Sequence, residues 1–186
     1  MTVNYPQPSA ERSALLEQIR ERALFRGEFT LSSGLKADYY VDLRRINLAG
    51  ATAPLVGRVM LDTVSDLEFD AVGGLTMGAD PMAVAIMYAA VAQGRDLDAF
   101  VVRKAGKAHG LQRRIEGPDI KGRRVLIVED ASTTGNSPLT AVEAAREAGA
   151  EVVAVACIIE RGAAAAIESA GLPYYAAYNE ADLLGT

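Results

Sequence analysis

The chain has 186 residues, half of them hydrophobic, and a formal net charge of −5. This length is within the range of one domain, and the hydrophobic content is enough for a sizeable core. The negative charge argues against a surface built throughout for nucleic acid, so we expect no nucleic-acid partner. With a single cysteine, Cys157, the chain cannot form an internal disulfide.

The amino-terminal stretch MTVNYPQPSAERS lacks the apolar segment of a secretory signal. The longest apolar run, from Met82 to Ala92, is shorter than the roughly 20 residues that a membrane-spanning helix needs. We therefore expect a soluble, cytoplasmic protein with no membrane partner.

The predicted elements begin with a helix that starts at Ser9 and stops at Gly27, where apolar residues recur at helical spacing. In chain order, the others are strands over 28–32 and 39–44, a helix over 51–66, a strand over 70–74, a helix over 80–93, strands over 98–104 and 124–130, a helix over 137–147, a strand over 151–160, a helix over 163–171 and an edge strand over 172–178. Asp80 is expected to cap the helix over 80–93, and Pro81 is expected in its first turn.

The strand segments VLIV and VVAVACII are apolar at every residue, which is typical of a parallel sheet covered by helices on both faces. We therefore predict an α/β fold with a mostly parallel central sheet flanked by helices. Residues 1–186 are expected to form one domain. Within it, residues 1–45 would form an N-terminal helix with two short strands, and residues from about 50 to 178 would form the core sheet.

A loop of small polar residues follows the strand over 124–130. That strand ends on Glu129 and Asp130, and the loop from Ser132 to Ser137 runs into a helix. Free backbone N–H groups and the positive end of the helix dipole would suit a phosphate there. The two carboxylates would repel a phosphate, but they could hold sugar hydroxyls or a Mg²⁺ ion. The pattern predicts a sugar-phosphate site, with an ordinary helix cap and turn as the alternative.

A cationic segment lies earlier in the chain, and it contains Arg103, Lys104, Lys107, His109, Arg113 and Arg114. A solvated charged loop is one interpretation. A nucleic-acid patch is another, but no aromatic residue is interleaved for base stacking. A loop that closes over a polyphosphate fits the predicted sugar-phosphate site best. We expect His109 to hydrogen-bond a phosphate rather than bind a metal.

Two further strand ends carry candidate site residues. The segment GGLTMGADP, residues 73–81, could offer backbone amides to an anion, or it could be a tight turn. Arg161 follows an apolar strand and could pair with a substrate carboxylate in a fork, with a surface ion pair as the alternative. Cys157 lies inside the same strand and is expected in the core.

The segment VLIVEDASTTGNS resembles the phosphoribosyl-diphosphate (PRPP) binding signature of the type I phosphoribosyltransferases. FTLSSGLKADYYVDLR and VVRKAGKAHG are similar to segments of the orotate-specific members, and the motifs keep their order from about Phe25 to Arg161. The resemblance implies Mg²⁺-dependent transfer of the phosphoribosyl group from PRPP to orotate. The products would be orotidine 5′-monophosphate and diphosphate, in pyrimidine biosynthesis. It also implies a homodimer with shared active sites and a hood, formed by residues 1–45, on the base side.

The resemblance also implies a role for each loop. Glu129 and Asp130 would hold the ribose hydroxyls directly or through Mg²⁺, and Lys107 and Asp130 would be the catalytic residues. The diphosphate loop would be Thr76, Met77 and Gly78. Orotate would contact Tyr40, Val41, Thr133 and Arg161. The remaining contacts to PRPP would come from Arg103, Lys104, Lys107, His109, Ser132, Thr133, Thr134, Gly135, Asn136 and Ser137.

Two positions depart from the family pattern. Ser32 and Met77 stand where many members have lysine, which removes positive charge next to the diphosphate, and Lys36 or the cationic loop could compensate. A phosphoribosyltransferase for a purine or uracil is one alternative, but Arg161 favours a carboxylated base. A non-catalytic PRPP-binding regulator is another, but we expect no separate DNA-binding segment. A ribose-phosphate diphosphokinase would need a nucleoside triphosphate site, which the motifs do not indicate.

Overall fold

A computed structural model describes residues 3–30, 36–104 and 114–185. Its main sheet has six strands in the order β5-β4-β3-β6-β7-β8, and every neighbouring pair is parallel except β4 and β5. The strands are β3 (Ala71–Leu75), β4 (Asp98–Val102), β5 (Ile115–Glu116), β6 (Arg124–Ser132), β7 (Glu151–Glu160) and β8 (Tyr174–Asn179). The predicted α/β fold with a mostly parallel sheet is confirmed.

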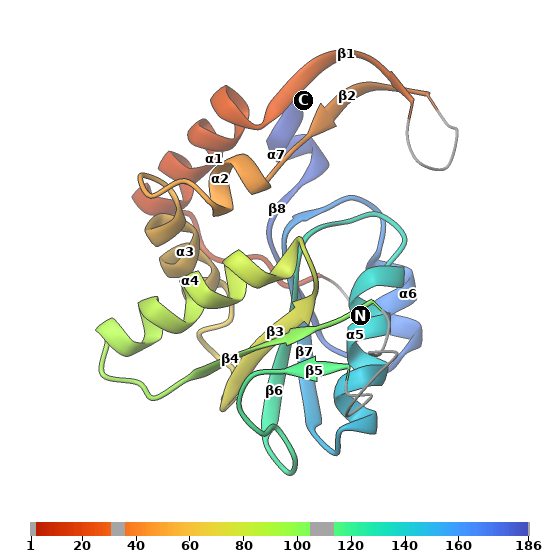
Figure 1. Cartoon of the computed structure of the whole chain (residues 1–186). Helices are drawn as coiled ribbons and strands as arrows, with labels where there is room; N and C mark the ends of the chain where they lie inside the picture. Colours follow the sequence, from red (N-terminus) through yellow and green to blue (C-terminus); the bar gives the residue numbers. More distant parts are fainter. Residues whose placement is uncertain (1–2, 31–35, 105–113, 186) are drawn as a thin grey trace.

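Helices cover both faces of this sheet (Figure 1). On one face lie α3 (Ala53–Thr63) and α4 (Ala79–Ala92), and on the other lie α5 (Asn136–Glu147) and α6 (Ala164–Ser169). Burial on both faces explains why β3, β6 and β7 are apolar along almost their whole lengths. Cys157 is fully buried in β7, as the sequence predicts.

Glycines allow the close packing that places α4 over the sheet. A Cβ added to Gly57 in α3 would lie 2.2 Å from the carbonyl oxygen of Ala85 in α4. A Cβ added to Gly74 in β3 would lie 2.1 Å from the carbonyl oxygen of Val128 in β6. No side chain fits at either distance, so the backbones touch directly. The start of α4 is thereby held close to the carboxyl end of β6.

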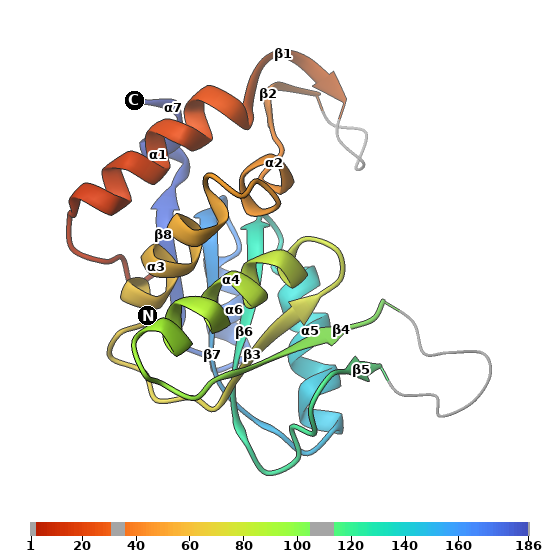
Figure 2. The same ribbon diagram turned by 60° about the vertical axis from the view of Figure 1, so that its left-hand side comes forward.

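The amino-terminal elements lie over the carboxyl edge of the sheet (Figure 2). They are α1 (Ala10–Arg22), the antiparallel hairpin of β1 (Leu24–Thr30) and β2 (Lys36–Val41), and α2 (Arg44–Asn47). Helix α1 begins after Ser9, whose side chain accepts a hydrogen bond from the Arg12 backbone N–H. The hairpin therefore stands beside the strand ends at which the sequence predicts ligand binding.

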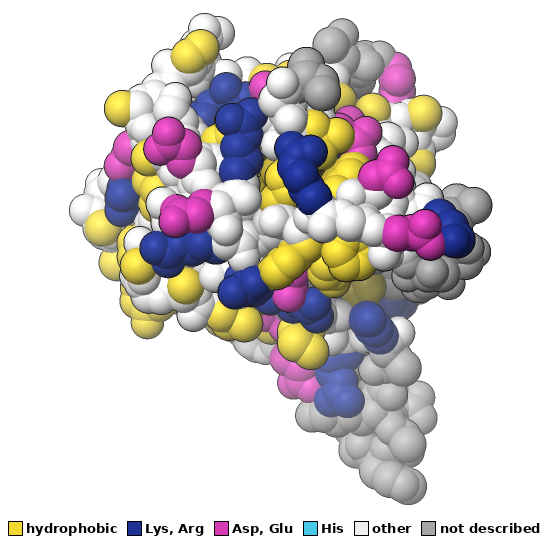
Figure 3. Space-filling view, turned by 90° about the horizontal axis from the view of Figure 1, so that it is seen from above, with side chains coloured by type: hydrophobic (Ala, Val, Ile, Leu, Met, Phe, Trp, Pro, Cys, Tyr) yellow, Lys and Arg dark blue, Asp and Glu magenta, His cyan; other side chains and the backbone are white. Residues whose placement is uncertain are grey.

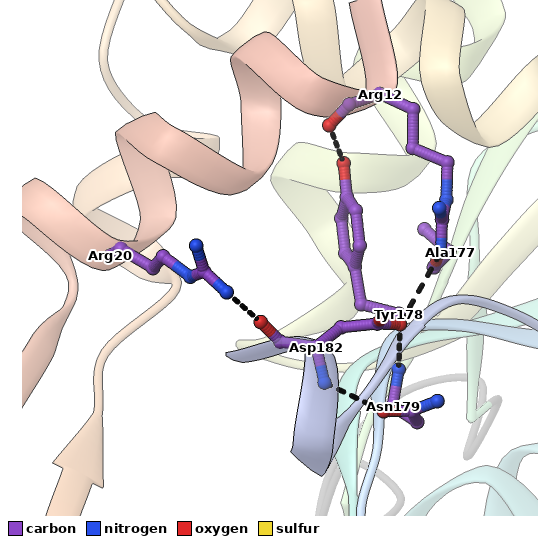
Figure 4. Close-up of polar contacts among 6 residues, drawn as sticks. All are labelled: Arg12, Arg20, Ala177, Tyr178, Asn179 and Asp182. Atoms are coloured by element: carbon purple, nitrogen blue, oxygen red, sulfur yellow. Dashed lines mark hydrogen bonds and ion pairs between the residues drawn. The ribbon is translucent and has the colours of Figure 1, made fainter. Parts of the chain in front are cut away.

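The last helix, α7 (Glu180–Leu184), ties the end of the chain to α1 (Figure 4). Asn179 and Asp182 form a capping box at its start. Arg12 donates hydrogen bonds to the Ala177 carbonyl at 2.9 Å and to Asp182 at 3.3 Å. The Tyr178 hydroxyl donates to the Arg12 carbonyl at 2.6 Å. The first and last helices are thus joined by polar contacts.

Several predicted boundaries were wrong. Helix α1 ends at Arg22 instead of Gly27, which lies inside β1 with a φ of 149°. The strand expected over 39–44 is part of β2 and stops at Val41. Gly78, rather than Asp80, is the N-cap of α4. The sequence reading also missed α2, β5 and α7, which are too short to show a period.

Strand β1 begins at Leu24, four residues before the predicted start at Glu28, and the other elements match their predictions to within about three residues at each end. Strand β7 has the predicted bounds, and β8 lies at the edge of the sheet as expected. Among the described residues, no helix is both long enough and apolar enough to cross a lipid bilayer.

Candidate active site

The paired acids lie near the carboxyl end of β6, beside the hairpin. Strand β6 continues past them to Ser132, so the expected strand end at Asp130 is two residues early. Ser132 is 3% exposed and belongs to the sheet rather than to the open loop. Gly135, with a φ of 78°, then turns the chain into α5. This left-handed conformation favours glycine.

The start of α5 has the geometry expected of an anion site. Thr133, Thr134, Asn136 and Ser137 are exposed around the first turn of this helix. Thr134 Oγ1 accepts a hydrogen bond from the Asn136 backbone N–H at 3.4 Å. Free N–H groups at a helix start attract anions, and the helix dipole adds to that attraction.

The two carboxylates are packed against the turn that follows β3. Glu129 is 6% exposed, and its Oε1 accepts the Asp130 backbone N–H at 3.1 Å. A Cβ added to Gly78 would lie 2.7 Å from that oxygen and 2.9 Å from Asp130 Oδ1. Burial and the neighbouring charge of Asp130 raise the pKa of Glu129 to about 8. A cation or hydroxyl donors would therefore stabilise the ionised pair.

The turn between β3 and α4 is held by polar contacts. The Thr76 backbone N–H donates to the Val102 carbonyl at 2.8 Å, and its hydroxyl donates to Asp80 at 2.7 Å. The Thr76–Met77 peptide bond is cis. Met77 itself is 62% exposed, so its side chain projects from the turn.

These segments enclose a pocket of about 390 Å³. The site residues predicted from the sequence that line this pocket come from the hairpin, the Thr76–Gly78 turn, the strand ends and α5. They are Tyr40, Val41, Thr76, Met77, Gly78, Lys104, Glu129, Asp130 and Ser137. The pocket thus brings together residues that are about 100 positions apart in the sequence. Half of the predicted site residues therefore line one pocket.

The sequence reading missed other residues that line this pocket, namely Asp42, Leu43, Arg44, Leu75 and Ala131. Of these residues, Arg44 adds a positive charge to the pocket. Its Nε lies 2.7 Å from Asp42 Oδ1, and its Nη2 donates to the Tyr40 hydroxyl at 3.3 Å. The arginine pair that follows YYVDL in the sequence was the available signal.

Several predicted residues do not line the pocket. Arg103 instead pairs with Glu116 at 3.3 Å. Lys107, His109 and Ser32 lie outside the described residues. Six further residues of the predicted site do not line this pocket, namely Ser132, Thr133, Thr134, Gly135, Asn136 and Arg161.

Arg161 follows β7 and is anchored beside the end of β6. Its backbone N–H donates to the Ser132 carbonyl at 2.9 Å. Its guanidinium lies over the ring of Tyr39, 4.7 Å from the ring centroid, and its Nε is 3.6 Å from Glu180 Oε1. The ion pair that we considered as an alternative is therefore present. It involves a partly buried arginine whose side chain is 17% exposed.

The face that bears these residues carries charges of both signs. Viewed from the hairpin side, Lys and Arg side chains lie among Asp and Glu side chains (Figure 3). Among the described residues, no group of three or more His, Cys, Asp or Glu side chains could hold a metal ion. Glu129 and Asp130 would therefore need oxygen atoms from a ligand to complete the coordination of a cation.

Comparisons with known proteins agree with this geometry. The phosphoribosyl transferase domain family matches residues 48–171. Orotate phosphoribosyltransferase from Streptomyces avermitilis is 70% identical over 175 residues, which cover 92% of this chain and 96% of the relative. Two crystal structures of orotate phosphoribosyltransferase from Mycobacterium tuberculosis H37Rv are also similar. The complex with Fe(III) dicitrate has a TM-score of 0.84 at 53% identity, and the PRPP complex has 0.80 at 48%. Each alignment covers 93% of this chain and 98% of the solved chain.

A parallel sheet with an acid pair before a helix start, together with the family match, defines a type I phosphoribosyltransferase. The chain belongs to the phosphoribosyltransferase family, among its orotate phosphoribosyltransferase members. The similarity to those members covers nearly the whole chain and not only the shared domain.

Proposed function

We propose that this chain transfers the 5-phosphoribosyl group of PRPP to orotate, forming orotidine 5′-monophosphate and diphosphate for pyrimidine nucleotide synthesis. The observation that carries the proposal is the pocket in which Glu129 and Asp130 face the Gly78 turn immediately before the start of α5. This arrangement offers carboxylates to sugar hydroxyls and amides to a phosphate. Both substrates are charged and water-soluble, which suits a cytoplasmic enzyme.

Each part of PRPP has a place in this arrangement. The 5′-phosphate would bind at the loop from Thr133 to Ser137, where the exposed hydroxyls add hydrogen-bond donors to the helix start. The ribose hydroxyls would bind Glu129 and Asp130. The diphosphate would lie against the backbone of Thr76, Met77 and Gly78, near Lys104. Arg103, Lys107 and His109 would supply further cationic contacts when the loop closes.

The reaction displaces diphosphate from C1 of the ribose, and positive charge develops on the sugar ring as that bond breaks. Asp130 would stabilise this charge, while Lys104 and Lys107 would stabilise the negative charge on the leaving group. Closure of the cationic loop would exclude water that could hydrolyse PRPP. Because a nitrogen of orotate attacks directly, positioning supplies much of the rate enhancement.

The donor set also fits a Mg²⁺ ion. Glu129 and Asp130 present hard oxygen ligands. Burial raises the pKa of Glu129, and a bound cation would offset that effect and favour the ionised form. When bound, Mg²⁺ would neutralise charge on the diphosphate and on the acid pair. These two residues would hold it together with oxygen atoms of PRPP.

The base would bind between the hairpin and the end of β7. Tyr40 and Val41 line the pocket on the hairpin side, and Arg161 and Thr133 follow the strands on the other side. Arg161 would pair with the orotate carboxylate. Residues 1–45 would then act as a hood over the base, within one domain that spans the chain.

We also propose a homodimer, which the family resemblance implies. An apolar groove of about 840 Å³ lies beside the active-site pocket, and Met77 lines both. Val84 and Tyr88 in this groove are 42% and 66% exposed. A second copy would bury this apolar surface.

The reaction is tested by mixing the purified protein with PRPP, Mg²⁺ and orotate, and following the ultraviolet absorbance of orotate. Parallel reactions contain uracil, hypoxanthine or adenine. We expect Mg²⁺-dependent consumption of orotate alone. Turnover of another base would overturn the base assignment and keep the PRPP site. PRPP binding without turnover of any base would support the regulator instead.

The dimer is tested by sedimentation equilibrium of the wild type and of Tyr88→Glu. We expect a dimeric wild type and a variant that dissociates, because a charge would be buried in an apolar contact. Tyr5→Glu, at a partly exposed tyrosine outside the groove, is the control. A monomeric wild type, or a Tyr88→Glu variant that remains dimeric, would rule out this interface.

A further inference from the structure

Arg161 is held by two residues from opposite ends of the chain. Its guanidinium lies over the ring of Tyr39 in β2, 4.7 Å from the ring centroid. Its Nε is 3.6 Å from Oε1 of Glu180, the first residue of α7. The Tyr39 hydroxyl donates a hydrogen bond to the same Glu180 oxygen. The three side chains form a closed triangle of one ring contact, one ion pair and one hydrogen bond.

We infer that Tyr39 and Glu180 are positioning residues that set the base specificity of the site by orienting Arg161. The inference rests on the proposed function, in which Arg161 binds the carboxylate of orotate. The ring of Tyr39 restricts the plane of the guanidinium, and the ion pair with Glu180 restricts its rotation within that plane. A pre-oriented guanidinium binds a carboxylate better in a fork, because less conformational freedom is lost.

The guanidinium of Arg161 has a second edge that could hold another carboxylate. Glu180 pairs with the Nε side of the guanidinium, whereas a substrate carboxylate can pair with the side formed by the two Nη atoms. The Glu180 side chain is 49% exposed, so water weakens its repulsion of a substrate anion. The Arg161 side chain is 17% exposed, so its own contacts are screened less.

Glu180 is itself fixed by the contacts of α7 with α1. Asn179 and Asp182 cap α7 on either side of Glu180. Arg12 pairs with Asp182 at 3.3 Å, and Arg20 donates to the Leu183 carbonyl at 3.2 Å. Figure 4 shows Arg12 and Arg20 reaching from α1 to this turn. The amino-terminal helix therefore supports the arginine at the base end of the site through α7.

The inference is tested with the full-length variants Glu180→Ala, Tyr39→Phe, Arg161→Ala and the double variant Glu180→Ala/Arg161→Ala. We measure kcat and KM for both substrates. Tyr39→Phe keeps the ring under Arg161 and removes the hydrogen bond to Glu180. We expect Glu180→Ala and Tyr39→Phe to raise KM for orotate by about threefold to tenfold, with KM for PRPP unchanged. In the Arg161→Ala background, Glu180→Ala should have no further effect.

Glu17→Ala is the matched control, because it removes the same charge from an exposed position on α1. Its orotate KM and the thermal midpoints of all variants should equal those of the wild type. An active wild type with an unchanged or lower orotate KM in Glu180→Ala would overturn the inference alone. A rise in orotate KM caused by Glu180→Ala in the Arg161→Ala background would also overturn the inference. A wild type that does not use orotate would overturn the proposed function as well.

Discussion

Gly78 lies directly against the carboxylate of Glu129. A Cβ at Gly78 would come within 2.7 Å of Glu129 Oε1, a distance at which one of the two groups must move. The absence of a side chain at Gly78 thus lets the turn after β3 close onto the acid pair at the end of β6. The two loops proposed to hold the diphosphate and the ribose meet at this contact.

Replacing Gly78 with alanine should therefore disturb the acid pair. We expect Gly78→Ala to destabilise the fold by about 1–3 kcal/mol, because the added methyl group overpacks a tight contact. It should also raise KM for PRPP by displacing Glu129 and Asp130. Chemical denaturation and steady-state kinetics measure the two effects. Gly50→Ala is the control, since a Cβ there has no neighbour within 4 Å. Because Gly50 lines the proposed dimer groove, the oligomeric state of this variant must also be checked. Equal behaviour of the two variants would show that the contact has no consequence.

Glu129 should make the stability of the ligand-free protein depend on pH. Burial and the charge of Asp130 raise its pKa from 4.5 to about 8. Between these values the folded protein keeps a proton that the unfolded chain has lost, so this group lowers stability as pH rises from about 5 to 8. We expect Glu129→Gln to lose that decline. The measurement is urea denaturation of both proteins across this range, without Mg²⁺ or PRPP. Parallel pH profiles would show that Glu129 titrates normally.

We predict that Met77 limits PRPP binding, because it stands where the family resemblance implies a lysine, in the loop proposed to hold the diphosphate. Its side chain is 62% exposed, so a lysine would fit without burying charge. We expect Met77→Lys to lower KM for PRPP by about twofold to fivefold, an effect that added salt should weaken. Met77→Gln, which is polar without charge, controls for the lost thioether. Because Met77 also lines the proposed dimer groove, the oligomeric state of both variants must be checked.

Lys107 is expected to act on the leaving diphosphate rather than on the fold. Lys107→Ala should reduce kcat by about 100-fold, the effect of removing a charge-stabilising donor, and leave the thermal midpoint unchanged. Lys121→Ala, at an exposed lysine beside β6, should retain full activity. Turnover of Lys107→Ala near the wild-type rate would remove this residue from the mechanism.

Much of the fold followed from local patterns. The apolar runs of β6 and β7 indicated strands buried on both faces, and the acids after VLIV indicated a ligand site at their carboxyl ends. The missed elements, such as α7, contain too few residues for a periodic signal. Gly27 was misread as a helix stop because a glycine after a helix and one inside a strand look alike in sequence.

Residues close together in the chain were enough to indicate the α/β class, the residue types at the strand ends and the family resemblance. Long-range packing placed Gly78 against Glu129, Arg44 in the pocket, and Tyr39 and Glu180 around Arg161. Those contacts join residues far apart in the chain. They depend on how the hairpin, the turn after β3 and α7 pack against one sheet edge, which no local pattern encodes.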